Sequence, residues 1–145
     1  MAEAAPAKRG TTRTKARKRA LDILFEADLR ELPATEILAD HTEWADPAVR
    51  PFSAELVTGV AHSISRLDAE LARHLPEGWS VERMPRVDRN LARIAAYEIL
   101  DMQTDPAVVL AECLTLATEL STDESPAFLN GVLGALVRAK RPESE

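Results

Sequence analysis

The chain has 145 residues, of which 46% are hydrophobic, 29% charged and only 4% aromatic. This length and composition predict one soluble globular domain built from helices, and they exclude a largely disordered chain. The formal net charge is −6, a single cysteine excludes an internal disulfide, and no apolar run approaches the roughly 20 residues that span a bilayer. We expect a cytoplasmic protein, since the N-terminus also lacks the apolar segment of a signal peptide.

Basic residues are concentrated near the N-terminus. Residues 1–19 contain seven bases and one acid, a net charge of +6, while the rest of the chain contains eleven bases and 23 acids, a net charge of −12. A basic segment on an acidic body attracts polyanions locally, so we expect contact with an anionic partner to be confined to one edge. The basic run consists of Lys8, Arg9, Arg13, Lys15, Arg17, Lys18 and Arg19.

Apolar residues recur three or four positions apart in most of the chain, which predicts helices. Residues 1–12 lack this period and are expected to form a flexible basic arm, followed by a single helical domain over 13–140 and a polar tail over 141–145. We expect helices over about 14–30, 33–39, 51–75, 85–103, 106–120 and 126–137. No segment alternates with a period of two, so the predicted fold class is all-α, with six or seven helices.

Signatures of catalysis are missing from the sequence. The three histidines lie far apart, none belongs to a Glu-x-x-His motif, and the P-loop, GxGxxG, GxSxG and CxxC patterns do not occur. Cys113 falls on the apolar side of its predicted helix, so a buried structural thiol is favoured over a nucleophile. We therefore expect no enzymatic activity, no cofactor and no metal site.

The basic run has two interpretations. One is a solvated basic tail; the other is an arginine-rich element that binds RNA, with Arg13, Arg17 and Lys18 or Arg19 projecting from the first helix. Arginine forks match phosphate and stack on unpaired bases. Cations at a helix N-terminus oppose the helix dipole, at a cost of roughly a few tenths of a kcal/mol each, which a bound anion would offset. This argument favours RNA binding.

Three stretches of the sequence, residues 16–26, 79–100 and 121–133, resemble one protein family. They read ARKRALDILFE, WSVERMPRVDRNLARIAAYEIL and STDESPAFLNGVL. Their combination is distinctive, and from Arg13 to about Lys140 the chain is similar to the NusB family of bacterial transcription antitermination factors. The resemblance implies two three-helix bundles packed together, with an arginine-rich RNA-binding element at the N-terminus.

The resemblance also implies partners and a role. NusB-like proteins pair with NusE, a small-subunit ribosomal protein, and the pair binds the boxA element of nascent ribosomal RNA transcripts. RNA polymerase complexes modified in this way read through terminators. On this resemblance we expect an RNA-binding antitermination factor whose partners are boxA RNA, NusE and the RNA polymerase antitermination complex.

Several residues of the first predicted helix match positions of the family. Arg13, Lys15 and Arg17 correspond to basic positions of its RNA-binding motif, and Lys18 belongs to the same basic run. Phe25 matches an aromatic position of the family, with packing in the core as an equal alternative. The resemblance therefore implies an RNA-binding site that begins in the basic run and extends along this helix.

Two acidic residues further along the chain also match the family. Glu124 falls in an acidic loop that is linked to antitermination, and we include it in the RNA-binding site. Asp88 is expected on the side that faces NusE, with electrostatic stabilisation of its helix start as the alternative. The chain departs from the family at Ala111 and Thr118, where relatives commonly have asparagine and lysine. Any contact made by those two residues in relatives is altered here.

Two other functions remain open from the sequence. One is the NusB-like RNA-binding module of a ribosomal RNA cytosine methyltransferase. Such an enzyme also needs a cofactor-binding domain and a catalytic cysteine beyond the helical module. A self-associating helical scaffold would carry the basic arm only incidentally. Apolar residues on several helix faces allow a homodimer as well as a heterodimer, so the sequence does not fix the oligomeric state.

Overall fold

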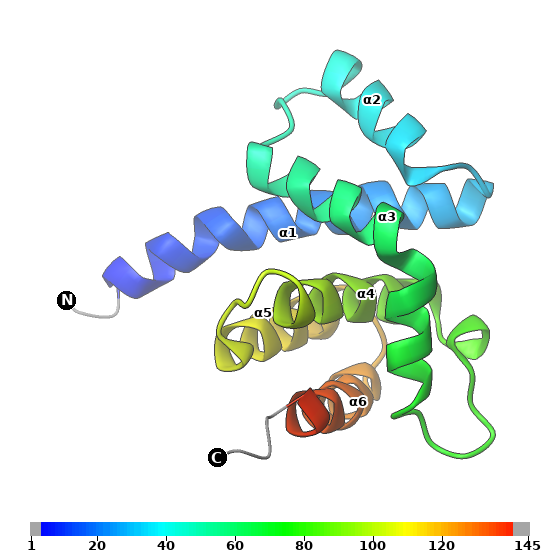
Figure 1. The fold of residues 1–145 in the computed structure, drawn as a ribbon. Helices are drawn as coiled ribbons and strands as arrows, with labels where there is room; N and C mark the ends of the chain where they lie inside the picture. Colours follow the sequence, from blue (N-terminus) through cyan, green and yellow to red (C-terminus); the bar gives the residue numbers. More distant parts are fainter. Residues whose placement is uncertain (1–3, 141–145) are drawn as a thin grey trace. The chain divides into compact units, whose positions relative to one another are not determined.

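The computed structural model describes residues 4–140, with side chains from residue 12 onward, and this range forms six α-helices and one short 3-10 helix (Figure 1). No strand occurs in this range, which confirms the predicted all-α class. The elements are α1 (Ala4–Arg30), α2 (Ala34–Trp44), α3 (Pro51–Ala72), η1 (Val81–Arg83), α4 (Arg86–Leu100), α5 (Pro106–Leu120) and α6 (Ser125–Lys140).

Helix α1 begins at Ala4, well before the start predicted at about residue 14. Most residues between 4 and 20 are alanine, lysine or arginine, which have high helix propensity. Pro6 lies in the first turn, where its missing N–H costs no hydrogen bond. The prediction relied on an apolar period that this stretch lacks, so it started the helix too late. The flexibility of the basic arm stays a prediction, and the polar tail at 141–145 lies outside the described residues.

The chain divides into two compact units, Met1–Ala61 and His62–Glu145, within the range that was expected to be one domain. Helix α3 runs through the boundary and is interrupted there, because Ser63 has non-helical backbone angles of φ −118° and ψ 15°. The first unit therefore holds α1, α2 and the first half of α3. The second unit holds the rest of α3 together with η1, α4, α5 and α6. The two helical bundles that the resemblance implied correspond to these units.

In the first unit, α1 is held to its neighbours by small residues and backbone acceptors. Ala16 on α1 is buried, and its carbonyl oxygen accepts a 2.7 Å hydrogen bond from Oγ of Ser53, which is fully buried on α3. Arg19 Nη2 donates to the carbonyl oxygen of Pro47, in the loop between α2 and α3, at 2.9 Å. These contacts fix α1 against the start of α3 and the loop that precedes it.

Helix α4 is the central element of the second unit. Ten of its 15 residues are buried, and it contacts both α5 and α6. Buried polar groups need partners inside the protein, because water cannot reach them. Arg93 Nε and Nη2 donate to the two carboxylate oxygens of Asp68, on the second half of α3, at 2.8 Å each. Arg93 Nη1 donates to Asn90 Oδ1 at 3.1 Å, so one arginine joins α4 to α3 and braces α4 itself.

We expect Arg93→Ala to lower the free energy of unfolding by about 3 kcal/mol, because it removes a two-pronged ion pair and leaves Asp68 without its cation. Urea denaturation of the two proteins measures the difference. Arg73→Ala is the matched control, since Arg73 is 69% exposed and 3.8 Å from Glu70, and it should change stability by less than about 0.5 kcal/mol. Equal effects of the two variants would contradict this view of Arg93.

A carboxylate joins α1 to α2 in the first unit. Glu26 accepts hydrogen bonds from His41 Nε2 of α2 at 3.0 Å and from Arg30 Nη1 at 2.7 Å. The hydrogen bond to His41 and then that to Arg30 hold the pKa of Glu26 below its usual range. A carboxylate whose pKa is lowered by folding adds stability above the pKa of the unfolded chain and loses it as the pH falls through the folded value.

We expect Glu26→Gln to lower stability by less than about 1 kcal/mol near pH 6, because the side chain is 34% exposed and solvent screens its contacts. The difference from the wild type should disappear as the pH falls through the lowered pKa of Glu26, where the wild-type carboxyl also becomes neutral. Urea titrations from pH 3 to pH 7 measure it. Glu43→Gln, at an exposed position of α2, is the control, and an effect of Glu26→Gln that is independent of pH would refute the prediction.

Candidate nucleic-acid interface

Four residues of the basic run form two separate groups on α1. Residues three or four positions apart lie on the same side of a helix. Arg13 and Arg17 therefore share one side, while Lys15 and Lys18 share another, with Phe25 further along the second side. The structure places these five predicted site residues on one helix but not on one face of it.

Phe52, in the first turn of α3, organises the arginine side of α1. The guanidinium carbon of Arg13 lies 3.9 Å from the centre of the Phe52 ring, and that of Arg17 lies 5.4 Å from it. Both distances are within the range of a cation–π interaction. Arg13 is exposed, whereas Arg17 is only 4% exposed, so the expectation that Arg17 projects from the helix is wrong. Nothing in the sequence periodicity marked Phe52 as their partner.

The lysine side of α1 is open to solvent. Lys15 and Lys18 are exposed, and Lys18 Nζ lies 3.2 Å from Asp22 on the next turn. An exposed pair of this kind contributes little energy, so Lys18 is readily available to another anion. Phe25 is half-buried and presents part of its ring on the same side. This side combines two mobile cations with an aromatic edge.

The second unit carries an arginine–aromatic cluster that the sequence analysis did not predict. The rings of Trp79 and Phe128 lie 5.4 Å apart at 49°, and the guanidinium carbon of Arg83 is 5.8 Å from the Trp79 ring. Trp79 is 44% exposed. Glu124 is exposed, and its carbonyl oxygen accepts the backbone N–H of Phe128 at 3.1 Å. The sequence did contain a signal for this cluster, because aromatic residues are scarce in the chain and both Trp79 and Phe128 fall in stretches that carry the family resemblance.

Asp88 occupies a different environment from the one expected of a partner contact. Its side chain is 3% exposed, and its two oxygens accept hydrogen bonds from Ser121 Oγ at 2.6 Å and Ser125 Oγ at 2.9 Å. A carboxylate occupied in this way is poorly placed to contact another protein. Direct contact with NusE through Asp88 is therefore a poor fit to the structure, and internal hydrogen bonding is what we observe.

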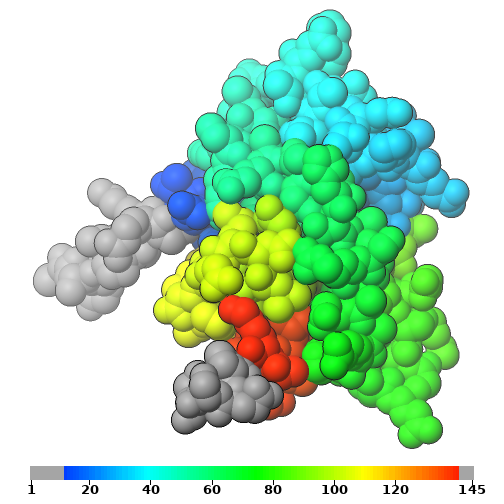
Figure 2. Space-filling view, in the orientation of Figure 1, coloured from blue at the N-terminus to red at the C-terminus, as the bar shows by residue number. Residues whose placement is uncertain are grey.

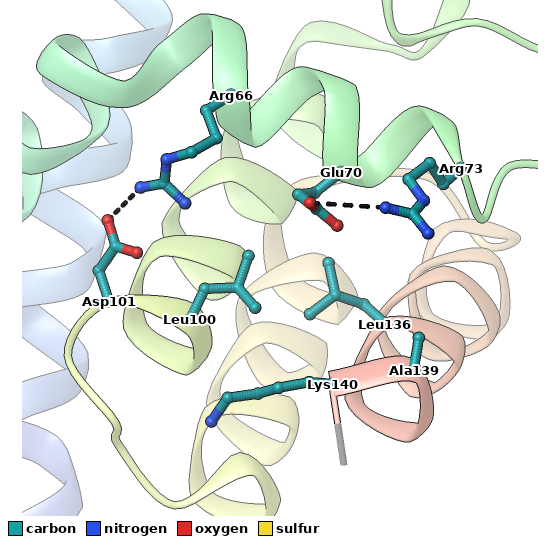
Figure 3. Close-up of a pocket in the computed structure, with 8 residues that line it drawn as sticks. All are labelled: Arg66, Glu70, Arg73, Leu100, Asp101, Leu136, Ala139 and Lys140. Atoms are coloured by element: carbon teal, nitrogen blue, oxygen red, sulfur yellow. Dashed lines mark hydrogen bonds and ion pairs between the residues drawn. The ribbon is translucent and has the colours of Figure 1, made fainter. Parts of the chain in front are cut away.

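A hollow of about 430 Å³ lies within the second unit. Figure 2 shows the end of α6, in red, beside the C-terminal half of α3, in green, and the hollow lies between them. Arg66 of α3 and Arg73, directly after α3, line it on one side, and Lys140 of α6 lines it on the other (Figure 3). Arg66 forms an ion pair with Asp101, and Glu70 lies 3.8 Å from Arg73. The charge of the lining is therefore nearly balanced, unlike that of the basic run.

Within residues 4–140, no helix has the length and apolar character needed to cross a membrane. Over the same stretch, no three histidine, cysteine or acidic side chains are grouped so that they could hold a metal ion. Cys113 is buried on α5, and this burial, with smaller effects of Asp88 and Glu98, raises the pKa of its thiol to about 12.

We expect Cys113 to be almost unreactive toward thiol reagents in the folded protein at pH 8. With a pKa of about 12, roughly one molecule in ten thousand carries the reactive thiolate, compared with about a quarter for an unperturbed cysteine. Labelling with a chromogenic disulfide, with and without denaturing urea, measures the contrast. Equally fast labelling in both conditions would show that the thiol is accessible in the native state.

The fold and these features define a class of protein: an all-helical chain of two compact units whose first helix is strongly basic, as in arginine-rich RNA-binding elements. The sequence profile of the NusB family matches residues 14–138. The chain belongs to the NusB family, which confirms the resemblance drawn from the three sequence stretches.

Relatives and solved structures agree with this membership. The transcription antitermination protein NusB of Salinispora arenicola is 52% identical over 128 residues, which cover 86% of this chain and 93% of that protein. That of Acidothermus cellulolyticus is 54% identical over 130 residues, covering 89% and 88%. Among structures, T. maritima NusB is 26% identical with a TM-score of 0.78, covering 91% of this chain and 94% of that one. A crystal structure of antitermination factors NusB and NusE in complex with dsRNA is 25% identical with a TM-score of 0.78, covering 88% and 96%.

Proposed function

We propose that the chain is an RNA-binding transcription antitermination factor that acts with NusE on the boxA element of ribosomal RNA transcripts. The observation that carries this proposal is the cationic α1, with exposed Lys15 and Lys18 on one side and Arg13 held on Phe52 on the other. The rest of the chain carries a net charge of −12, so the strongest attraction for a polyanion is near this element. Family membership and the related NusB–NusE–dsRNA complex support it.

The residues of α1 have different tasks in this proposal. Lys15 and Lys18 attract phosphates as mobile point charges, and Phe25 offers a ring edge to a base. Arg13 is already ordered by its contact with Phe52, so it loses less conformational freedom when it binds a phosphate. Buried Arg17 acts indirectly, because it packs on the same ring and supports Arg13.

The cluster on the second unit supplies a different kind of contact. The exposed ring of Trp79, with Phe128 and Arg83, forms a platform on which an unpaired base can stack. The exposed carboxylate of Glu124 can accept a hydrogen bond from the amino group of a base, and it repels phosphate. We propose that this cluster contacts bases, whereas the cations of α1 contact phosphates.

The partners and cellular setting belong to the same proposal. The complex of related NusB and NusE with dsRNA supports NusE and RNA as partners, and the RNA polymerase antitermination complex is the assembly in which both would act in the cytoplasm. The role is that of an adaptor and not of an enzyme. The antitermination proteins of Salinispora arenicola and Acidothermus cellulolyticus match this chain over 93% and 88% of their length, which favours the adaptor over a methyltransferase module.

Fluorescence anisotropy with a boxA RNA, with and without NusE, tests the proposal. With three or four phosphate contacts, the slope of log affinity against log salt should be about −2 to −3. Lys15→Ala combined with Lys18→Ala should weaken binding about tenfold or more and make the slope shallower by about 1.4, since two counterion-releasing contacts are lost. Arg30→Ala, on α1 but outside the basic run, should leave both quantities nearly unchanged.

The outcomes separate the site from the function. Undiminished binding by the double lysine variant would remove α1 from the RNA-binding site. If the wild-type protein binds no boxA RNA, even with NusE present, the proposed function itself is refuted. A stable homodimer that shows no RNA binding would favour the self-associating scaffold instead.

A further inference from the structure

We propose that Asp88 is the positioning residue for the Trp79–Phe128 cluster, acting from the first turn of α4 on the turn that joins α5 to α6. The cluster itself is described by the contacts of Trp79, Arg83 and Phe128. That it binds RNA rests on the proposed function. That Asp88 sets its geometry rests on hydrogen bonds within the second unit.

Asp88 holds both ends of the α5–α6 turn. Its Oδ1 accepts from Ser121, the residue that ends α5, and its Oδ2 accepts from Ser125, the first residue of α6. Ser121 donates its single hydroxyl hydrogen to this carboxylate, while Ser125 Oγ also lies 2.9 Å from Ser121 Oγ and 2.8 Å from Thr122 Oγ1. Ser125 Oγ in turn accepts the backbone N–H of Thr122 at 3.2 Å. The buried carboxylate and these hydroxyl contacts together hold the turn that carries Glu124.

The next residue of α4, Arg89, holds the segment that carries Arg83 and Trp79. Arg89 Nη1 donates to the carbonyl oxygen of Glu82 in η1 at 3.0 Å. Arg83, also in η1, donates from Nη1 to the carbonyl oxygen of Gly78 at 2.9 Å, beside Trp79. Successive residues of a helix point about 100° apart, so Asp88 and Arg89 reach two different neighbours from a single turn.

The contact between Trp79 and Phe128 depends on this arrangement. The two rings come from segments that are far apart in the sequence, and each segment is fastened separately to the first turn of α4. Ser125 is 1% exposed, and without Asp88 its hydroxyl loses its charged acceptor and keeps only the hydroxyls of Ser121 at 2.9 Å and Thr122 at 2.8 Å as partners. We expect the turn to shift when this charged acceptor is lost, so that Phe128, one helical turn after Ser125, moves relative to Trp79.

Trp79 fluorescence tests the positioning without RNA. In a Trp44→Phe background, Trp79 is the only tryptophan that remains, and Trp44 is suitable for replacement because it is 77% exposed. We expect Asp88→Ala to increase quenching of Trp79 by acrylamide, and Asp88→Asn, which keeps a carbonyl acceptor, to have a smaller effect. Unchanged quenching in Asp88→Ala, in a protein whose circular dichroism remains helical, would overturn the proposal.

A double-mutant cycle on RNA binding separates positioning from general stability. Asp88→Ala should weaken boxA binding about fivefold when Phe128 is present and have little further effect in a Phe128→Ala background, because coupled residues are not additive. With Lys15→Ala, whose contact is on α1, the effects on log affinity should add. A loss of the same size in the Phe128→Ala background would mean that Asp88 has only a structural role.

Ser121→Ala keeps the proposal testable if Asp88→Ala does not fold. Ser121 is half-buried, and its removal deletes one of the two hydrogen bonds to Asp88 while Ser125 keeps the other. We expect the same direction of change in quenching and in the RNA cycle, at a smaller size. If wild-type protein binds no RNA, the proposed function fails, yet the quenching of Trp79 still decides whether Asp88 positions the cluster.

Discussion

The second unit depends on one constraint: helix α4 is buried along most of its length, so its polar side chains must find their partners inside the protein. Arg93 meets this requirement with Asp68 on α3, and Asp88 meets it with the serines of the α5–α6 turn. Arg89 reaches a backbone carbonyl in η1. The positions of three neighbouring segments are therefore set by hydrogen bonds from one helix. The most distinctive polar residues of the family resemblance work mainly within the fold.

The sequence predicted what depends on neighbours along the chain and missed what depends on neighbours in space. The helices beyond residue 14 follow from an apolar period, and the cationic character of α1 follows from composition. Burial of Asp88 was not foreseeable, because its serine partners lie 33 and 37 positions away. The pairing of Arg17 with Phe52 was missed for the same reason. A helical period shows which side chains share a side, but not which element covers that side.

Identical residue types consequently have opposite tasks in this protein. Arg93 and Arg17 are buried and organise packing, whereas Arg13, Lys15 and Lys18 are exposed and available to an anion. Counting basic residues in a motif therefore overestimates the number of contacts with RNA. The same caution applies to acidic residues, since Asp88 is enclosed and Glu124 faces solvent. In a family recognised by short motifs, burial is the observation that separates the residues that maintain the fold from those that bind.

The shared ring of Phe52 has a thermodynamic consequence. Arg13 and Arg17 bring two positive charges to one ring, and the cation–π attraction acts against their mutual repulsion. A polyanion that binds at exposed Arg13 therefore meets the second charge of Arg17 close by in the folded first unit. A ligand that binds only the folded form raises the melting temperature by mass action. In this protein, bound RNA would stabilise the folded helix that recognises it, so the melting temperature would rise with the fraction of protein that is bound to RNA.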